Sequence, residues 1–131
     1  MKKYLVVGFT LWLLARSSGA AAPAEHPSAT PQDVFDSMRA TFHAEKAGGV
    51  RARYQFEISG ARGGVWSIEV RDAHAHFQRA KIQNPDVTLI VSDKDWVALS
   101  NDKLSGPWAY LTGRLKVRGN HLLARKLDEL F

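Results

Sequence analysis

The fold of this chain is decided by its last third, which begins with Asn84-Pro-Asp-Val-Thr-Leu-Ile-Val-Ser-Asp-Lys-Asp-Trp96 and continues through Lys103-Leu-Ser-Gly-Pro-Trp-Ala-Tyr-Leu-Thr-Gly113. Arg114-Leu-Lys-Val-Arg-Gly119 and Asn120-His-Leu-Leu-Ala-Arg-Lys-Leu-Asp-Glu-Leu-Phe131 follow. Their hydrophobic spacing predicts a strand, a helix, a short second helix, a strand and a terminal helix. These segments are rich in large apolar side chains and carry no nucleophile motif, metal cluster or phosphate loop. The pattern favours a pocket for an apolar molecule over a site that makes or breaks bonds.

The composition indicates one ordinary globular domain. The chain has 131 residues, of which 45% are hydrophobic and 24% charged. It contains no cysteine, which excludes disulfides, thiolate metal sites, a cysteine nucleophile and a lipid-modified N-terminal cysteine. Three of its 18 basic residues precede position 17, whereas all 13 acidic residues follow it. The remaining excess of positive charge is small and scattered, so we expect no nucleic-acid partner.

The N-terminus has the three regions of a secretory signal peptide. Met1-Lys-Lys3 supplies positive charge, Tyr4 to Ala15 is an apolar run too short to span a bilayer, and Ser18-Gly-Ala-Ala-Ala22 is a small-residue stretch. We therefore predict a cleaved signal peptide over residues 1–21, a Pro-containing linker over 22–29 and a folded domain over 30–131. The prediction implies export, to a bacterial periplasm or outside the cell. An uncleaved anchor or a mis-set start codon is the alternative, and a non-functional leader would leave the protein cytoplasmic.

The first half of the predicted domain reads as a helix followed by a hairpin. Thr30-Pro-Gln-Asp33 has the residues of a helix start, with Thr30 as the cap. Residues 51–59 and 66–71 then alternate between apolar and polar side chains, on either side of the glycine-rich turn 60–64. A sheet with one apolar and one polar face is typical of an antiparallel sheet that is covered by helices on one side only.

The remaining elements complete a two-layer domain. We predict a third strand over residues 76–82, a turn at 84–86 and a strand over 87–92 that lies nearer the sheet centre. Asp93 is the predicted cap of the next helix. The whole is a predicted α+β (α/β two-layer) fold, in which a five-stranded, mostly antiparallel sheet is covered on one face by about four helices.

From about Val34 to Phe131 the chain resembles the sterol carrier protein domain family, the non-specific lipid-transfer fold. The resemblance is carried by several short stretches in the family's order and spacing: Tyr54-Gln-Phe-Glu-Ile-Ser-Gly60, Gly63-Gly-Val-Trp66, Asn84-Pro-Asp-Val-Thr88, Ser92-Asp-Lys-Asp-Trp96, Leu111-Thr-Gly-Arg-Leu-Lys-Val-Arg-Gly119 and the terminal Leu-Ala-Arg-Lys-Leu run that ends in Phe131. Two departures from the family pattern are the turn Asp72-Ala-His-Ala75, where Asp-Gly is usual, and Asn101-Asp-Lys103, where Gly-Lys is usual.

The resemblance implies a hydrophobic tunnel between the sheet and the helices, and binding of fatty acyl chains, sterols, phospholipid or acyl-CoA without catalysis. It implies no cofactor and no metal. We further expect a monomer that contacts membranes transiently. The resemblance places nine apolar side chains at the lipid: Phe56, Ile68, Trp96, Leu99, Trp108, Leu111, Leu123, Leu127 and Leu130.

Other readings of the sequence stay open. The same fold with a filled core would be an accessory module that serves a partner enzyme, and a variant of it would handle isoprenoid quinones. A hydrolase using Asp95 and His121 is the enzymatic alternative. His74 and His76 could share one strand face, but with only Asp72 nearby we expect a surface pair rather than a zinc site. The segment 60–64 lacks the Lys-Ser/Thr of a phosphate loop, so we expect a turn.

An empty tunnel would be expensive for so small a domain. A void of ~400 Å³ at ~24 cal/mol per Å³ would cost ~10 kcal/mol, as much as a domain's whole stability. We therefore expect the ligand-free protein to be wet inside, partly collapsed or loosely lidded.

Overall fold

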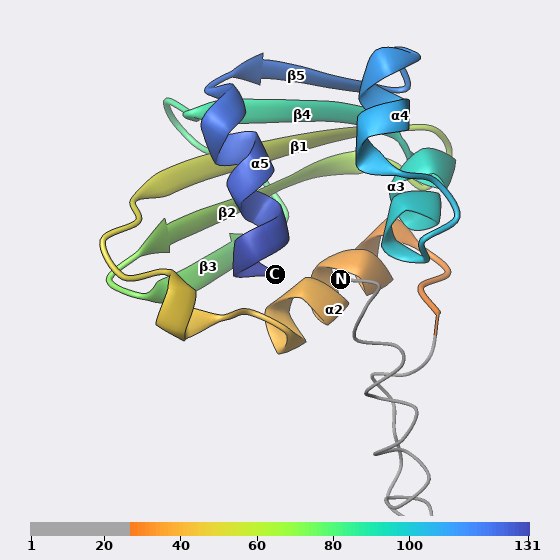
Figure 1. Cartoon of the computed structure of the whole chain (residues 1–131). Helices are drawn as coiled ribbons and strands as arrows, with labels where there is room; N and C mark the ends of the chain where they lie inside the picture. Colours follow the sequence, from red (N-terminus) through yellow and green to blue (C-terminus); the bar gives the residue numbers. More distant parts are fainter. Residues whose placement is uncertain (1–26) are drawn as a thin grey trace, which may run out of the picture.

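The computed structural model describes residues 27–131 and shows two layers, a sheet and a set of helices that cover one of its faces (Figure 1). The α+β fold predicted from the sequence is confirmed. The predicted signal peptide and the first residues of the predicted linker lie outside the described residues. Within that linker, the backbone N–H of Ser28 donates to Asn101 Oδ1 at 2.9 Å, and Asn101 Nδ2 donates to the Ser28 carbonyl at 2.9 Å.

The described residues form five strands and four α-helices. The strands are β1 (Ala52–Ser59), β2 (Gly64–Arg71), β3 (His74–Gln78), β4 (Val87–Ser92) and β5 (Leu115–Gly119). The helices are α2 (Pro31–Ala40), α3 (Asp93–Ser100), α4 (Gly106–Leu111) and α5 (His121–Leu130), with a single 3-10 turn η2 (Ala44–Lys46) after α2. No helix within residues 27–131 has the length and apolar character needed to cross a membrane.

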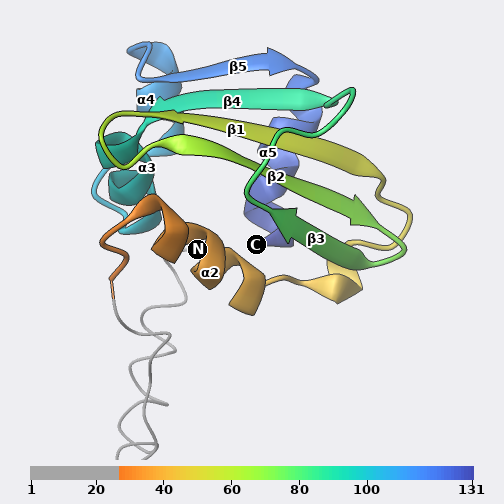
Figure 2. The same cartoon turned by 180° about the vertical axis from the view of Figure 1, so that it is seen from behind.

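The strand order is β3-β2-β1-β4-β5, so β1 is the central strand and β4 is interior. All neighbours pair antiparallel except β1 and β4, which pair parallel. The chain must therefore cross from β3 past β2 and β1 before it reaches β4. Figure 2 shows that this connection passes over the face of the sheet that carries no helix. We call this face the outer face and the helix-covered face the inner face.

The crossing corrects the predicted third strand. The sequence predicts a strand over 76–82, whereas β3 ends at Gln78 and residues 79–86 form the connection. The backbone N–H of Ile82 donates to Gln55 Oε1 at 3.1 Å, which fastens the connection to the outer face. Polar residues on that face are consequently buried, among them Gln55, Ser67 and Thr88. Alternation failed here because the connection leaves the sheet while keeping apolar residues at strand-like spacing.

The helix starts follow from hydrogen bonding by short side chains. Thr30 caps α2 as predicted, since its hydroxyl accepts from the Asp33 N–H while the Asp33 carboxylate accepts from the Thr30 N–H. The predicted cap of α3 is one residue off: Ser92 Oγ accepts from the Asp95 N–H. Asp93 instead accepts the Arg62 N–H at 3.0 Å, which ties the β1–β2 turn to α3. This bond is the first cause of the lowered pKa of the Asp93 carboxyl group.

Asp86 joins three strands at one end of the sheet. Its carboxylate accepts the Arg53 N–H at 2.8 Å, and its own N–H donates to the Arg53 carbonyl at 2.8 Å. Its carbonyl accepts the Asn120 N–H at 2.9 Å, just after β5. Gly119, with φ of +94°, lets β5 approach here, because a Cβ at this position would collide with the Asp86 carbonyl. The Asn84-Pro-Asp86 segment is therefore both a turn and a brace for β1, β4 and β5.

The β2–β3 turn carries backbone strain that the sequence departure explains. Asp72 and Ala73 have φ of 52° and 58°, a pair of left-handed values typical of a tight hairpin turn. Aspartate tolerates this region, but alanine pays ~1–2 kcal/mol for it. The usual Asp-Gly pair would remove that cost.

We therefore expect Ala73→Gly to raise the free energy of unfolding by ~0.5–1 kcal/mol, the relief of strain less the extra entropy of glycine in the unfolded chain. Urea unfolding followed by circular dichroism measures the change. The matched control is Ala61→Gly in the other hairpin turn, where no positive φ is relieved. A lower midpoint for Ala73→Gly than for the parent chain would contradict this account.

Candidate functional site

The inner face divides into a filled half and a thinly covered half, and the predicted lipid-contacting residues are split between them. Phe56, Ile68, Trp96 and Leu130 are buried in the core. Leu99, Leu123 and Leu127 are half-buried at its margin. Trp108 and Leu111 project into solvent, with 58% and 77% of their surface exposed. The structure therefore does not bring the nine side chains together around one enclosed space.

Four aromatic rings fill the space beneath α2 and α3. Phe35 of α2 lies at their centre, with ring centroids 5.1 Å from Phe56, 5.0 Å from Trp66 and 5.3 Å from Trp96. Trp96 of α3 also contacts Phe56, at 5.4 Å. Offset and edge-on packing of this kind adds to the burial energy of each ring. These side chains interlock, so this half serves as the structural core.

The other half lies over β4 and β5, beneath α4 and α5. Leu89 and Val91 of β4 face inward and are buried, whereas Leu115 and Val117 of the edge strand β5 are only half-buried. Helix α4 contributes one fully buried side chain, Ala109, to this side. The helices therefore cover β4 completely and the edge strand β5 only in part. This half of the inner face is the candidate site.

Helix α5 is anchored at its C-terminal end and less so at its start. Leu130 and Phe131 are buried, and the Phe131 ring contacts Phe42 at 5.3 Å and Phe77 at 5.9 Å. The Leu130 carbonyl accepts the His43 N–H at 2.7 Å. At the first turn, by contrast, Leu122 is 72% exposed. The C-terminal end of α5 is therefore buried against the filled half. Its first turn, beside β5, carries an exposed apolar side chain.

Tyr54 is the polar tie between the sheet and the middle of α5. Its hydroxyl donates to the Leu123 carbonyl at 2.8 Å, although the side chain is otherwise enclosed by the core. Burial raises the pKa of the Tyr54 phenol to about 12, and the Asp86 carboxylate adds a smaller contribution in the same direction. The neutral, hydrogen-bonding form of Tyr54 therefore persists well above neutral pH.

Trp96 carries a buried polar atom with no acceptor. Its Nε1 makes no hydrogen bond, although the side chain is only 8% exposed. A buried donor left without a partner costs ~1–3 kcal/mol. The unpartnered N–H lies in the filled half and is therefore a cost of packing the four rings together.

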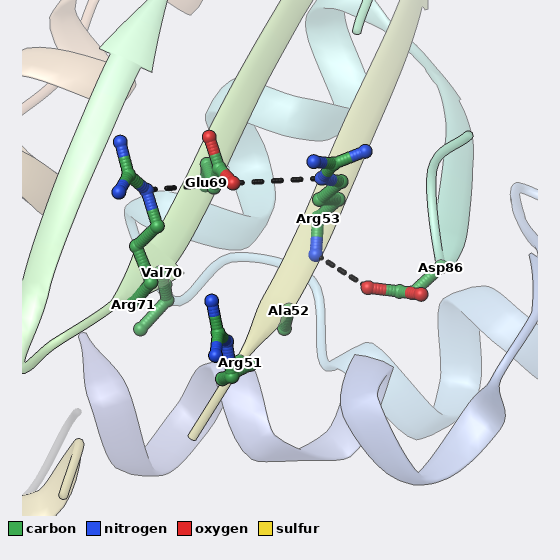
Figure 3. A pocket seen from close by; sticks show the side chains of 7 residues that line it. All are labelled: Arg51, Ala52, Arg53, Glu69, Val70, Arg71 and Asp86. Atoms are coloured by element: carbon green, nitrogen blue, oxygen red, sulfur yellow. Dashed lines mark hydrogen bonds and ion pairs between the residues drawn. The ribbon is translucent and has the colours of Figure 1, made fainter. Parts of the chain in front are cut away.

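The two pockets found among the described residues lie on the outer face, and none of the nine predicted residues lines either of them. The larger, of about 250 Å³, is bordered by Arg51, Arg53, Glu69, Arg71 and Asp86 (Figure 3). Glu69 lies 3.5 Å from the Nε atoms of both Arg53 and Arg71. Charged walls of this kind do not suit an apolar ligand. The tunnel implied by the resemblance therefore remains a prediction for the inner face.

The groups considered for catalysis and metal binding have structural roles here. Asp95 pairs with Arg114 at 3.1 Å, whereas the His121 ring lies against Tyr110 at 6.1 Å, and no interaction joins Asp95 to His121. His74 and His76 lie side by side on β3, with ring centroids 6.3 Å apart. Across residues 27–131, no group of three or more His, Asp or Glu side chains is close enough to hold a metal ion.

Fold and site together define an α+β domain whose helix layer leaves part of an apolar sheet face accessible. The sequence model of the SCP-2 sterol transfer family matches residues 35–131, and the chain belongs to this family. The resemblance to the sterol carrier protein domain family, noted from short stretches of sequence, is thus confirmed.

Relatives include both isolated domains and longer proteins. The solution structure of sterol carrier protein domain 2 of Helicoverpa armigera is 29% identical, covers 80% of this chain and 88% of its own, and has a TM-score of 0.60. The solution structure of palmitated SCP2L2 from Aedes aegypti is 26% identical over 73% of this chain and 88% of its own, also with a TM-score of 0.60. Hydroxysteroid dehydrogenase-like protein 2 of Bos taurus is 28% identical over 82% of this chain, which spans 26% of that relative.

Sequence reasoning missed the residues that hold the site together. Phe35 and Phe131 are the rings that fill the core and anchor α5, and neither is among the nine side chains predicted for the site. Tyr54 was read as an inward strand residue, with no partner for its hydroxyl. The available signal was chemical: a buried tyrosine needs a hydrogen-bond partner, which local sequence cannot supply.

The Tyr54 contact predicts an alkaline loss of stability. The unfolded chain ionises near the ordinary pKa of 10.0, whereas the folded protein holds the proton to about 12. Stability is therefore intact below pH 10 and falls as the pH rises from about 10 to about 12. Urea unfolding of the parent chain and of Tyr54→Phe across this range isolates the contribution.

We expect Tyr54→Phe to be ~1 kcal/mol less stable at neutral pH, because one hydrogen bond is lost. The difference between the two proteins should shrink or reverse above pH 10. A gap that stays constant across the range would show that Tyr54 does not titrate as described.

Proposed function

We propose that this chain binds and carries hydrophobic ligands without catalysing a reaction. The ligand classes are those of the sequence prediction: fatty acyl chains, sterols, phospholipids or acyl-CoA. The observation that carries the proposal is the inner side of the edge strand β5, where the apolar side chains of Leu115 and Val117 pack against the core but are only half-buried beneath α4 and α5. Among the relatives, palmitated SCP2L2 of Aedes aegypti supports a fatty acyl chain as the first ligand to test.

The energetics suit reversible carriage. Each buried methylene gains ~0.8 kcal/mol, so a sixteen-carbon chain gains ~12 kcal/mol. Burial of the same acyl chain in a bilayer gains a similar free energy. The protein therefore only has to compete with the bilayer for the chain. A closed, empty tunnel would lower the stability of the domain too much. An inner face with one filled half and one loosely covered half avoids most of this loss of stability. Ligand entry then needs movement of α4 and the open end of α5, while the four-ring core stays in place.

The test is binding of a fluorescent fatty acid to the full chain, with Val117→Trp and Val65→Trp compared with the parent. Val117 is half-buried on the inner face of β5, whereas Val65 is half-buried on the outer face of β2. The added indole at position 117 occupies the proposed ligand space, so we expect its affinity to fall at least about tenfold. Val65→Trp should bind as the parent does.

Native mass spectrometry of the parent chain reports ligand occupancy independently. A parent chain that takes up no acyl, sterol or phospholipid ligand would overturn the proposed function. Normal binding by Val117→Trp would leave carriage standing but place the ligand elsewhere. Bound ligand should also raise the melting temperature.

A second candidate function is an accessory module of the same fold for a partner enzyme, including one that handles isoprenoid quinones. It is favoured by the curated relatives, in which the matched region is a minor part of a longer protein such as hydroxysteroid dehydrogenase-like protein 2. A quinone in the native mass spectrum, in place of acyl lipid, would favour this candidate.

Export and a monomeric state are part of the proposal and rest on the sequence. Residues 1–26 lie outside the described structure, so the signal peptide is tested on the protein itself. We expect the N-terminal sequence of the protein expressed in a bacterium to begin after Ala20 or Ala21, and the protein to fractionate with the periplasm. A retained Met1 in a cytoplasmic fraction would contradict export.

A further inference from the structure

The exposed apolar side chains are concentrated on two adjoining helices. Within residues 27–131, the large hydrophobic side chains with strongly exposed surfaces are Trp108, Tyr110 and Leu111 of α4 and Leu122 of α5. We call these four residues the α4–α5 patch. Contiguous apolar surface on a soluble domain usually marks an interaction site.

One ring contact links the two helices. The Tyr110 ring lies edge-on to His121, with centroids 6.1 Å apart, and so links the end of α4 to the first turn of α5. Both helices adjoin β5, the edge strand of the sheet (Figure 1). Only Ala109 of α4 is buried, so the large side chains of that helix face outward.

The segment of sequence that carries the patch is basic. Between positions 103 and 127 there is no acidic residue, and six basic residues lie in that interval: Lys103, Arg114, Lys116, Arg118, Arg125 and Lys126. Three of them are paired, Arg114 with Asp95, Arg118 with Glu57 and Lys126 with Glu129. In the part of the chain that the structure describes, Lys103, Lys116 and Arg125 form no ion pair.

We propose that the α4–α5 patch docks on an anionic membrane surface. Tryptophan and tyrosine prefer the level of the lipid headgroups, leucine side chains enter the acyl boundary, and each neighbouring cation contributes ~1 kcal/mol on an anionic leaflet. A second copy of this chain fits poorly, because pairing two patches would bring two sets of unneutralised cations together. Docking here would set the bilayer against the thinly covered half of the inner face.

The test uses local tryptophan emission in the full chain carrying Trp12→Phe. Trp66 and Trp96 are 4% and 8% exposed, so Trp108 reports contact with the membrane. Vesicles of phosphatidylcholine, with or without phosphatidylglycerol, carry bromine on their acyl chains as a quencher. We expect quenching and a blue shift with the anionic vesicles and little change with the neutral ones. The further replacement Trp108→Phe should abolish the quenching.

Charge variants separate local docking from general attraction. Lys103→Glu with Arg125→Glu reverses two cations beside the patch, and we expect vesicle partitioning measured by Trp108 quenching to fall at least about tenfold. Arg51→Glu with Lys81→Glu makes the same change in net charge at exposed positions away from it, and should change partitioning much less. Thermal unfolding checks that both double variants remain folded.

Three results would overturn the proposal. The chain could sediment with anionic vesicles while Trp108 stays unquenched, which would place the contact elsewhere. Both double variants could lose binding equally, which would show only general charge attraction. Trp108 could be shielded from acrylamide in a concentration-dependent dimer without vesicles, which would make a second copy the occupant. Because fatty-acid binding is measured without vesicles, failure here leaves the proposed function separately testable.

Discussion

Packing of Phe35 against the rings of Phe56, Trp66 and Trp96 is the interaction on which the rest of the structure depends. It joins α2 and α3 to β1 and β2. It also places these four large aromatic side chains together in one half of the inner face. The other half is packed with aliphatic side chains, and those on the edge strand β5 are only half-buried. The distinction between a rigid core and an accessible apolar surface therefore follows from where the aromatic residues lie.

Helix α5 is attached to the rest of the domain by contacts of different kinds. The buried Phe131 ring fixes one end of α5, and the Tyr54 hydroxyl holds its middle through one carbonyl. Beyond these, the helix carries exposed residues at its start, and α4 rests on Ala109. Local opening costs least where few apolar contacts are broken, so movement of the cover should begin there. A domain that must admit an apolar molecule without unfolding benefits from this division.

Hydrogen bonds from polar residues join elements that are distant in sequence. Asp86 braces three strands, and Asp93 ties the first hairpin turn to α3. In both cases a glycine lies beside the carboxylate or carbonyl, and a Cβ there would collide with it. The short motifs that carry the family resemblance thus include residues with a structural reason for their identity, quite apart from any ligand.

Local pattern was sufficient for the fold class, the first hairpin, the strand 87–92 and the cap at Thr30, because these depend on periodicity and on side chains within three residues of the backbone groups they bind. It failed at the end of β3 and at the cap of α3, where a crossing connection and a competing turn decided the outcome. The family resemblance also placed Trp96 and Trp108 together among the predicted lipid contacts. Only the tertiary structure separated them, burying the first against Phe35 and leaving the second in solvent, because the partner of each side chain comes from another element and burial depends on which element packs above it.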